Sequence, residues 1–174
     1  MRQIIRRTAL AVTITTALIS ASFAQETTKG CFARSYPAQH MAAHPGQQVK
    51  EIRVRQYDRV GGADEYFDIR VRFRDDPREF SAPTYCHDMD GRRACMIECD
   101  GGVIYPAQTS DGGLRLTTSY LRADTSEALP GQSVGDGECA GPVTRSIADQ
   151  DARGQGIETV FVLQPRQIAE CDWQ

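Results

Sequence analysis

Apolar and polar residues alternate most regularly between residues 66 and 74. Phe67, Ile69, Val71 and Phe73 take every second position there, and tyrosine, aspartate or arginine residues take the positions between them. A period of two residues puts one set of side chains on each face of a β-strand. The pattern therefore predicts a strand with one buried face and one face in water.

Shorter runs of the same kind predict further strands. Ile52 and Val54 alternate with arginines, and a loop with glycines at 61 and 62 separates this run from residues 66–74. Pro83 is expected at a sheet edge or a bulge, because proline has no backbone N–H to donate. The other predicted strands cover residues 80–86, 95–99, 103–105, 114–120 and 159–163.

Between these strands stand Asp-Gly pairs that begin at Asp90, Asp100 and Asp111. An aspartate that tolerates positive φ, followed by glycine, suits the tight turns of antiparallel hairpins. The pairs therefore predict a β-meander.

Two segments interrupt the strand pattern, and a third precedes it. A short helix is expected after Ser35, which can cap it, and before Pro45, which ends it, with Met41 packed against the β-structure. Residues 25–30 are polar and are expected to be frayed. Residues Arg122–Gln155 are rich in Asp, Ser, Gly, Pro and Gln, which predicts a long loop that is either functional or tied down by its cysteine.

The first 24 residues have the three parts of a secretory signal peptide. Arginines at 2, 6 and 7 precede an apolar run from Thr8 to Ile19, and small residues at Ser22 and Ala24 mark a cleavage site before Gln25. The run is too short to span a bilayer. We therefore expect cleavage after residue 24 and a single soluble domain, residues 25–174, in a periplasm or outside the cell.

All six cysteines follow residue 24, which indicates a disulfide framework in an exported chain. A two-residue turn centred on Asp90 and Gly91 sets Cys86 opposite Cys95, at a Cα separation of roughly 4.5 Å that a disulfide accepts. We therefore predict Cys86–Cys95. Among the pairings open to the other four cysteines, we favour one that ties the chain ends together and one that pins the long loop, Cys31–Cys171 and Cys99–Cys139.

These elements together predict an all-β protein with a short N-terminal helix and a disulfide framework. About seven to eight antiparallel strands joined by successive hairpins favour an up-and-down barrel, with a sandwich as the alternative. The expected architecture is similar in outline to small periplasmic β-barrel inhibitors and lipocalin-like proteins. This likeness of size, export and strand count implies a fold and no particular function.

Charge narrows the classes of partner. The leader holds three of the 20 basic residues and none of the 23 acidic ones, which leaves a net charge of −6 on residues 25–174. This balance argues against general nucleic-acid binding, which rests on neutralising phosphates with Lys and Arg.

Candidate catalytic and metal-binding residues are few. His40 and His44 have the spacing of paired zinc ligands, but Met41 stands where the HExxH signature needs glutamate. His87 could act as a base, yet it has neither a G-x-S-x-G serine nor an unpaired cysteine to activate. The aspartates of the Gly-rich turns fit no EF-hand or β-roll template. We therefore predict no catalytic residue, no metal site and no cofactor, and a hydrolase is the least favoured function.

Two other functions compete. A binding module, such as an inhibitor of or adaptor for an envelope or secreted protein, is favoured over a carrier of a small apolar ligand, because the large inward side chains should fill the barrel. Pairing the strands around Ile52 and Ile69 sets Arg53 opposite Arg70 and Arg55 opposite Asp68. This arrangement predicts a basic stripe for an acidic protein surface or an anionic envelope glycan, formed by Arg53, Arg55, Arg70, Arg72 and Arg74.

Overall fold

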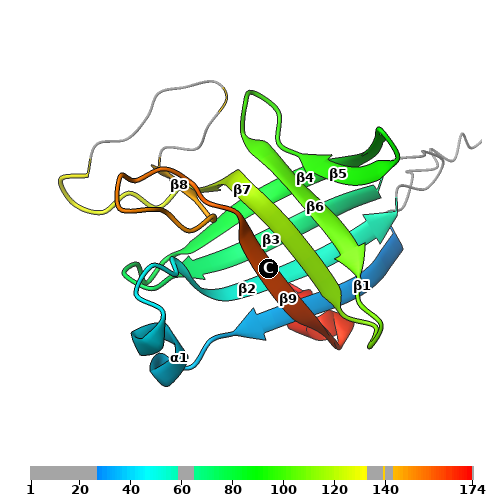
Figure 1. Ribbon diagram of the computed structural model, residues 1–174, viewed down its shortest axis with the longest axis horizontal. Coiled ribbons are helices and arrows are strands. Elements are labelled where there is room, and N and C mark those ends of the chain that lie inside the picture. The colour runs from blue at the N-terminus through cyan, green and yellow to red at the C-terminus, as the bar shows by residue number, and fades with distance from the viewer. Residues whose placement is uncertain (1–26, 59–64, 133–138, 140–142, 174) are drawn as a thin grey trace, which may run out of the picture.

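The computed structural model describes residues 27–58, 65–132, 139 and 143–173 as an antiparallel β-barrel (Figure 1). Eight strands follow one another in the order β6-β5-β4-β3-β2-β1-β9-β7, and the pairing of β6 with β7 closes the barrel. β8 adds to the far end of β7, outside this ring. The strands are β1 (Thr27–Ser35), β2 (Val49–Asp58), β3 (Glu65–Phe73), β4 (Glu79–Met89), β5 (Arg92–Met96), β6 (Gly102–Gln108), β7 (Leu114–Thr125), β8 (Val143–Ser146) and β9 (Thr159–Arg166).

The predicted register of the central hairpin is confirmed. In the pairing of β2 with β3, Arg53 stands opposite Arg70 and Arg55 stands opposite Asp68. Ile69 and its apolar neighbours two residues away point inward and are buried. A slip of one residue would expose all of them, so burial of one face fixes this register. The glycines at 61 and 62 lie outside the described residues.

The turn at Asp90 and Gly91 also forms as predicted. Both residues have positive φ, 50° and 77°, as a type I′ turn requires. Met89 therefore pairs with Arg92. The structure has three disulfides, and they join the same cysteine pairs that the sequence predicts: Cys31–Cys171, Cys86–Cys95 and Cys99–Cys139.

Large apolar side chains occupy the barrel interior. Phe67, Phe73, Phe80 and Phe161 are at most 1% exposed, and Phe73 packs edge-on against Phe80 with ring centroids 5.0 Å apart. Burying a phenylalanine contributes roughly 1.5–3 kcal/mol. Packing of these rings, with the aliphatic residues around them, accounts for much of the stability of the barrel.

Three predicted boundaries are wrong, and each error has a physical reason. Residues 25–30 are not all frayed, because β1 starts at Thr27 and gains partners in both β2 and β9. The strand predicted at 95–99 ends at Met96, and Cys99 adopts a positive φ of 57° in the turn that follows. Residues Arg122–Gln155 are not one loop, because β7 continues to Thr125 and pairs there with β8.

The short helix α1 (Ala38–Ala43) forms, but Ser35 does not cap it. Ser35 belongs to β1, and Pro37 takes the N-cap position without a side-chain hydrogen bond. Met41 is buried, as expected for the residue that packs the helix against the barrel. Pro83 faces Asp68 on one side and lies beyond the end of the β4–β5 pairing on the other, so its missing N–H disrupts no ladder there.

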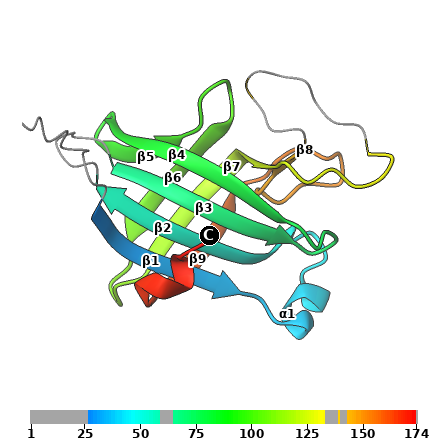
Figure 2. The same cartoon turned by 180° about the vertical axis from the view of Figure 1, so that it is seen from behind.

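The chain ends with a 3-10 turn, η1 (Ile168–Cys171), which lies against β1 and β2 (Figure 2). The predicted leader, residues 1–24, lies outside the described residues. Within the described part of the chain, no helix is long and apolar enough to cross a membrane.

Candidate functional site

The arginines of the predicted stripe follow the outer face of β2 and β3, and most of them lie beside carboxylates. Arg55 Nη1 lies 2.5 Å from Asp172 Oδ1, and Arg70 Nε lies 3.2 Å from Asp68 Oδ1. Arg53 and Arg72 both approach Glu79. The stripe is therefore largely charge-compensated within the chain. Arg72 has the most exposed side chain of these four, at 46%.

Trp173 covers the middle of the stripe. The guanidinium carbons of Arg53 and Arg70 lie 5.3 and 5.2 Å from the centroid of its ring, which is the geometry of a cation–π contact. Its indole Nε1 donates a hydrogen bond to Asp68 Oδ2 at 2.6 Å. The disulfide at Cys171, two residues earlier, fixes the segment that presents this ring.

Arg74 has a different role from the rest of the predicted stripe. It lies one residue beyond β3, and its guanidinium donates hydrogen bonds to carbonyl oxygens of α1 and of the loop that follows it. The acceptors are the carbonyls of Met41 at 3.1 Å, His44 at 3.1 Å, Pro45 at 2.7 Å and Gln47 at 3.1 Å. These bonds attach α1 to the end of the barrel.

Next to the stripe, a row of aromatic and apolar side chains crosses the outer face of the barrel. Each residue stands directly opposite the next on the neighbouring strand, so all six lie on one face. We call these residues the aromatic row: Tyr57, Tyr66, Tyr85, Met96, Val103 and Tyr120.

The rings of the aromatic row pack against one another. Tyr57 and Tyr66 stack with centroids 5.0 Å apart, and Tyr85 follows at 6.0 Å. The guanidinium of Arg55 lies 4.9 Å from the centroid of Tyr57, so the row continues into the stripe. Tyr85, in the middle of the row, is 36% exposed, and Tyr120, at its far end, is 46% exposed.

A hollow of about 460 Å³ adjoins the middle of the row. Met96, Ile97 and Val103 supply its apolar wall, and the turn after β5 supplies its rim. Cys99 and Asp100 in this turn have φ values of 57° and 56°, a left-handed conformation that non-glycine residues seldom adopt. The Cys99–Cys139 disulfide anchors the turn.

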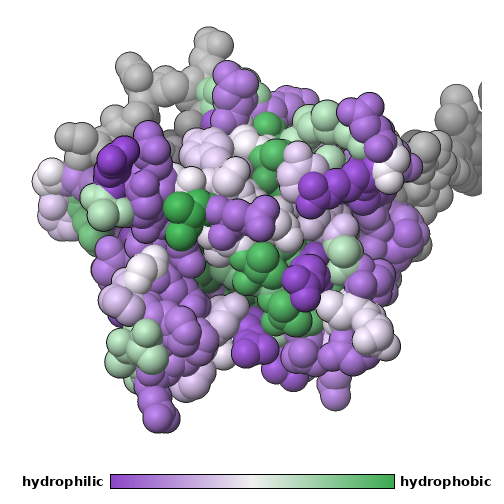
Figure 3. Space-filling model, viewed as in Figure 1, coloured by the Kyte–Doolittle hydropathy of each residue, from purple (hydrophilic) through white to green (hydrophobic). Residues whose placement is uncertain are grey.

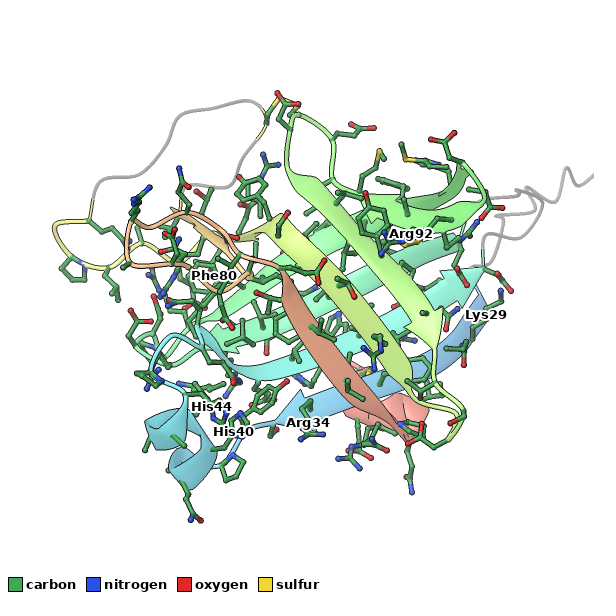
Figure 4. The ribbon with its side chains drawn as sticks, in the orientation of Figure 1. Lys29, Arg34, His40, His44, Phe80 and Arg92 are labelled. Atoms are coloured by element: carbon green, nitrogen blue, oxygen red, sulfur yellow. A yellow bond between two sulfur atoms is a disulfide. The ribbon has the colours of Figure 1, made fainter. Side chains whose placement is uncertain are left out.

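A second hollow, of about 350 Å³, opens at the end of the barrel where β1 begins. Phe67 and Leu114 are part of its apolar wall, and the carboxylate of Glu65 lies among its polar groups. Lys29 Nζ lies 3.4 Å and Arg93 Nη2 3.2 Å from this carboxylate. A side-chain hydrogen bond with Asp58 raises the pKa of Lys29. Figure 4 shows Lys29 at this end, beside β1.

The histidines form no catalytic or metal arrangement in the described part of the chain. His40 and His44 stack with centroids 4.1 Å apart, and His40 Nε2 lies 2.9 Å from Gln47 Oε1 in a hydrogen bond. His87 is exposed on the outer face of β4. Among the residues described here, no three His, Cys, Asp or Glu side chains are grouped to hold a metal ion.

Apolar side chains also gather on the outer surface outside the aromatic row. Figure 3 shows hydrophobic side chains gathered near the centre of the view, over β7 and β9, with hydrophilic ones around them. Val160 on β9 belongs to this face and is 42% exposed. It lies outside the aromatic row and offers a matched control for tests of that row.

Sequence reasoning found the stripe and missed the row. Tyr57, Tyr66 and Tyr85 are far apart in the sequence, and only the pairing of three strands makes them neighbours. The signal was available, because extending the predicted β2–β3 register by two residues sets Tyr57 opposite Tyr66. The chain matches no protein-family model, no curated protein and no solved structure in the three comparisons made.

Proposed function

We propose that this chain is a non-catalytic protein-binding module that works in an oxidising compartment, in a periplasm or outside the cell. The observation that carries the proposal is the aromatic row on the outer face of the barrel. Tyrosine, tryptophan, methionine and arginine are enriched at protein interfaces. Tyrosine, tryptophan and arginine are also the residues most often found in binding hot spots. The row and the adjoining stripe bring all four residue types together.

Two features support an oxidising compartment. Disulfides persist in oxidising surroundings and are rare in the cytosol, and this structure has three. The predicted leader at residues 1–24 would direct export. Either a periplasm or the exterior would keep the bonds intact.

The surface also suggests the chemistry of the partner. The hollow beside Met96 and Val103 could receive an apolar anchor side chain, as the central pocket of an interface does. Arg72, at the far end of the stripe, is exposed enough to meet a carboxylate. The partner is therefore a protein with an apolar or aromatic centre and acidic residues on one side of it. An anionic glycan would depend on the arginines and would have no side chain to place in the apolar hollow.

The filled interior supports this function over that of a carrier. Phenylalanines at four positions occupy the inside of the barrel, where a carrier would need free volume. The hollow at the barrel end has Glu65 and two cations beside its apolar wall. It suits a small polar group better than a long apolar ligand.

The proposal is tested by affinity capture with the oxidised protein from envelope and culture-fluid extracts. A double variant, Tyr85→Ser with Met96→Ser, removes the centre of the row without touching the barrel interior. We expect it to lose the captured protein. The matched control Val160→Ser removes a similarly exposed apolar side chain on β9 and should capture as the wild type does.

Arg72→Gln separates the two kinds of partner. A protein partner should bind this variant at most about fivefold more weakly, because one exposed charge pair contributes under about 1 kcal/mol. Capture that survives the loss of Tyr85 and Met96, and fails only without Arg72, would refute the protein-binding face in favour of a glycan.

A further inference from the structure

The three disulfides differ in how far they are open to solvent. In the bonds made by Cys31 and by Cys86, all four cysteines are buried, at 2% exposure or less. In the third bond, both Cys99 and Cys139 are exposed. A thiolate attacks a disulfide only where it can reach a sulfur atom. Of the three bonds, Cys99–Cys139 is therefore the one open to exchange while the barrel stays folded.

The turn that carries Cys99 is also held by contacts other than its disulfide. Between β5 and β6, the backbone N–H of Ile97 donates to the carbonyl of Gly102 at 3.2 Å. Arg122 on β7 binds the same turn, since its backbone N–H donates to the carbonyl of Gly101 at 2.7 Å and its Nη1 to that of Cys99 at 3.3 Å. These bonds remain when the disulfide opens, so exchange at Cys99 is a local event.

Carboxylates flank the exposed cysteine of this turn. Glu98 and Asp100 are the neighbours of Cys99 in the chain, and both are exposed. Their charges repel a thiolate that arrives with further negative charge, and they attract one that basic groups surround. The turn therefore favours a reductant with neutral or basic residues beside its thiol.

We propose that Cys99–Cys139 is a thiol-exchange site, which a protein dithiol reduces while the other two disulfides stay closed. One thiolate of the reductant attacks a sulfur of the bond and forms a mixed disulfide, and the other sulfur leaves as a thiolate that takes up a proton. The second thiol of the reductant then attacks the mixed disulfide and releases the remaining cysteine. The two electrons and two protons of the dithiol pass to Cys99 and Cys139, and the reductant ends as a disulfide.

A reductant with a single thiol completes this reaction less readily. Cys99 and Cys139 belong to one chain, so the thiolate released first stays at a high effective concentration near the mixed disulfide. It displaces a monothiol and closes the bond again. The second thiol of a dithiol competes with this return, which is why the site suits a dithiol.

The test is incubation of the folded, oxidised protein with an excess of reduced thioredoxin, used as the protein dithiol. Free thiols are alkylated at intervals and located by mass spectrometry of the peptides. We expect Cys99 and Cys139 to be labelled at least tenfold faster than the other four cysteines. In a parallel reaction with dithiothreitol, the emission of Trp173 should stay unchanged while only these two are labelled, because Cys31–Cys171 remains closed.

Two variants control the experiment. Cys99→Ser with Cys139→Ser keeps the other two disulfides, and it should show no free thiol at the dithiol concentration that half-reduces the wild type. Glu98→Gln with Asp100→Asn tests the role of charge. At low ionic strength its bond should open about two- to fivefold faster than that of the wild type with glutathione, which is anionic, and the gain should be smaller with dithiothreitol. Equal gains would refute the preference for a neutral or basic reductant.

Three results would overturn the site. The first is equal labelling of all six cysteines, or faster labelling of the buried four. The second is labelling by dithiothreitol but not by thioredoxin, because the bond would then be closed to a protein dithiol. The third is a red shift of Trp173 emission in step with the labelling of Cys99, because opening would then not be local. None of these results bears on the aromatic row, whose capture test uses the oxidised protein.

Discussion

The ion pair between Asp76 and Arg78 offers the sharpest test of how this barrel is held together. The side chains are only 9% and 5% exposed. Arg78 donates to both carboxylate oxygens, from Nε to Oδ1 at 3.0 Å and from Nη2 to Oδ2 at 2.7 Å, and its backbone N–H donates to Oδ1 at 3.0 Å. Its other end reaches the carbonyl of Glu127 and Gln132 Oε1. The pair therefore ties the β3–β4 turn to the segment after β7.

The side-chain hydrogen bonds from Arg78 lower the pKa of Asp76 from 3.8 to about 2. At about 1.36 kcal/mol for each pKa unit, this shift corresponds to roughly 2 kcal/mol of stability. A carboxyl whose pKa is lower in the folded state stabilises the protein above its unfolded pKa. That stability is lost as pH falls from about 4 toward 2.

Asp76→Asn should therefore lower the unfolding free energy by about 3–5 kcal/mol at pH 7, because it leaves the Arg78 charge buried without its counter-ion. The deficit relative to wild type should shrink by roughly 2 kcal/mol between pH 5 and pH 2. Urea unfolding of the oxidised protein at both pH values measures it.

Asp75→Asn is the matched control for this variant. Asp75 pairs with Arg145, but its side chain is 63% exposed. Such a pair contributes under about 1 kcal/mol, so the control should stay close to wild type. An Asp76→Asn deficit that is the same at pH 5 and pH 2 would refute the reasoning.

Three further predictions concern the backbone, the chain ends and the tryptophan. Gly102→Ala should destabilise the protein far more than Gly91→Ala, as measured by urea unfolding of the two variants. Both glycines have positive φ, which costs alanine about 1–2 kcal/mol. Of the two, only Gly102 would also bring a Cβ against the backbone, 2.2 Å from Tyr120 O. Equal losses would show that the close approach is relieved cheaply. Replacing Cys31 and Cys171 with alanine should cost about 5 kcal/mol, against about 2.6 kcal/mol for Cys86 and Cys95, because the first pair closes a loop of 140 residues and the second a loop of nine. Thermal unfolding ranks the two variants, and the reverse order would contradict the chain-entropy argument. Trp173→Ala should lower the unfolding free energy by about 1–2 kcal/mol, because the cation–π and hydrogen-bond contacts of the ring are lost. In the wild type, the fluorescence of this single tryptophan should shift to the red when Cys31–Cys171 is reduced. Unchanged emission after reduction would mean that the disulfide does not hold the ring in place.

The fold was predictable where the signal is local. Alternation over residues 66–74 and the turn at Asp90 and Gly91 fix one register each, and together they place the central strands correctly. β1 and β8 escaped prediction because neither alternates clearly. Each is defined by its pairing with other strands, β1 with β2 and β9, and β8 with β7. Tertiary pairing decided those segments, and propensity did not.

The candidate surfaces were likewise predictable only where the signal lies within one segment of the sequence. The arginines of the stripe were visible as the polar half of an alternating pattern, yet their carboxylate partners come from other segments. Trp173 covers Arg53 and Arg70 only because the distant Cys31 holds the end of the chain there.

The bond between Cys31 and Cys171 also makes the described barrel a covalently closed ring. Every strand from β2 to β9 lies between these two cysteines, so a protease that cuts one connecting segment opens the ring without splitting it into two molecules. The nicked chain keeps its strands as one molecule, and they can pair again without having to find one another by diffusion. Outside the cytoplasm, where no chaperone supplied with ATP would repair it, this linkage would let the protein survive a cut in a surface loop.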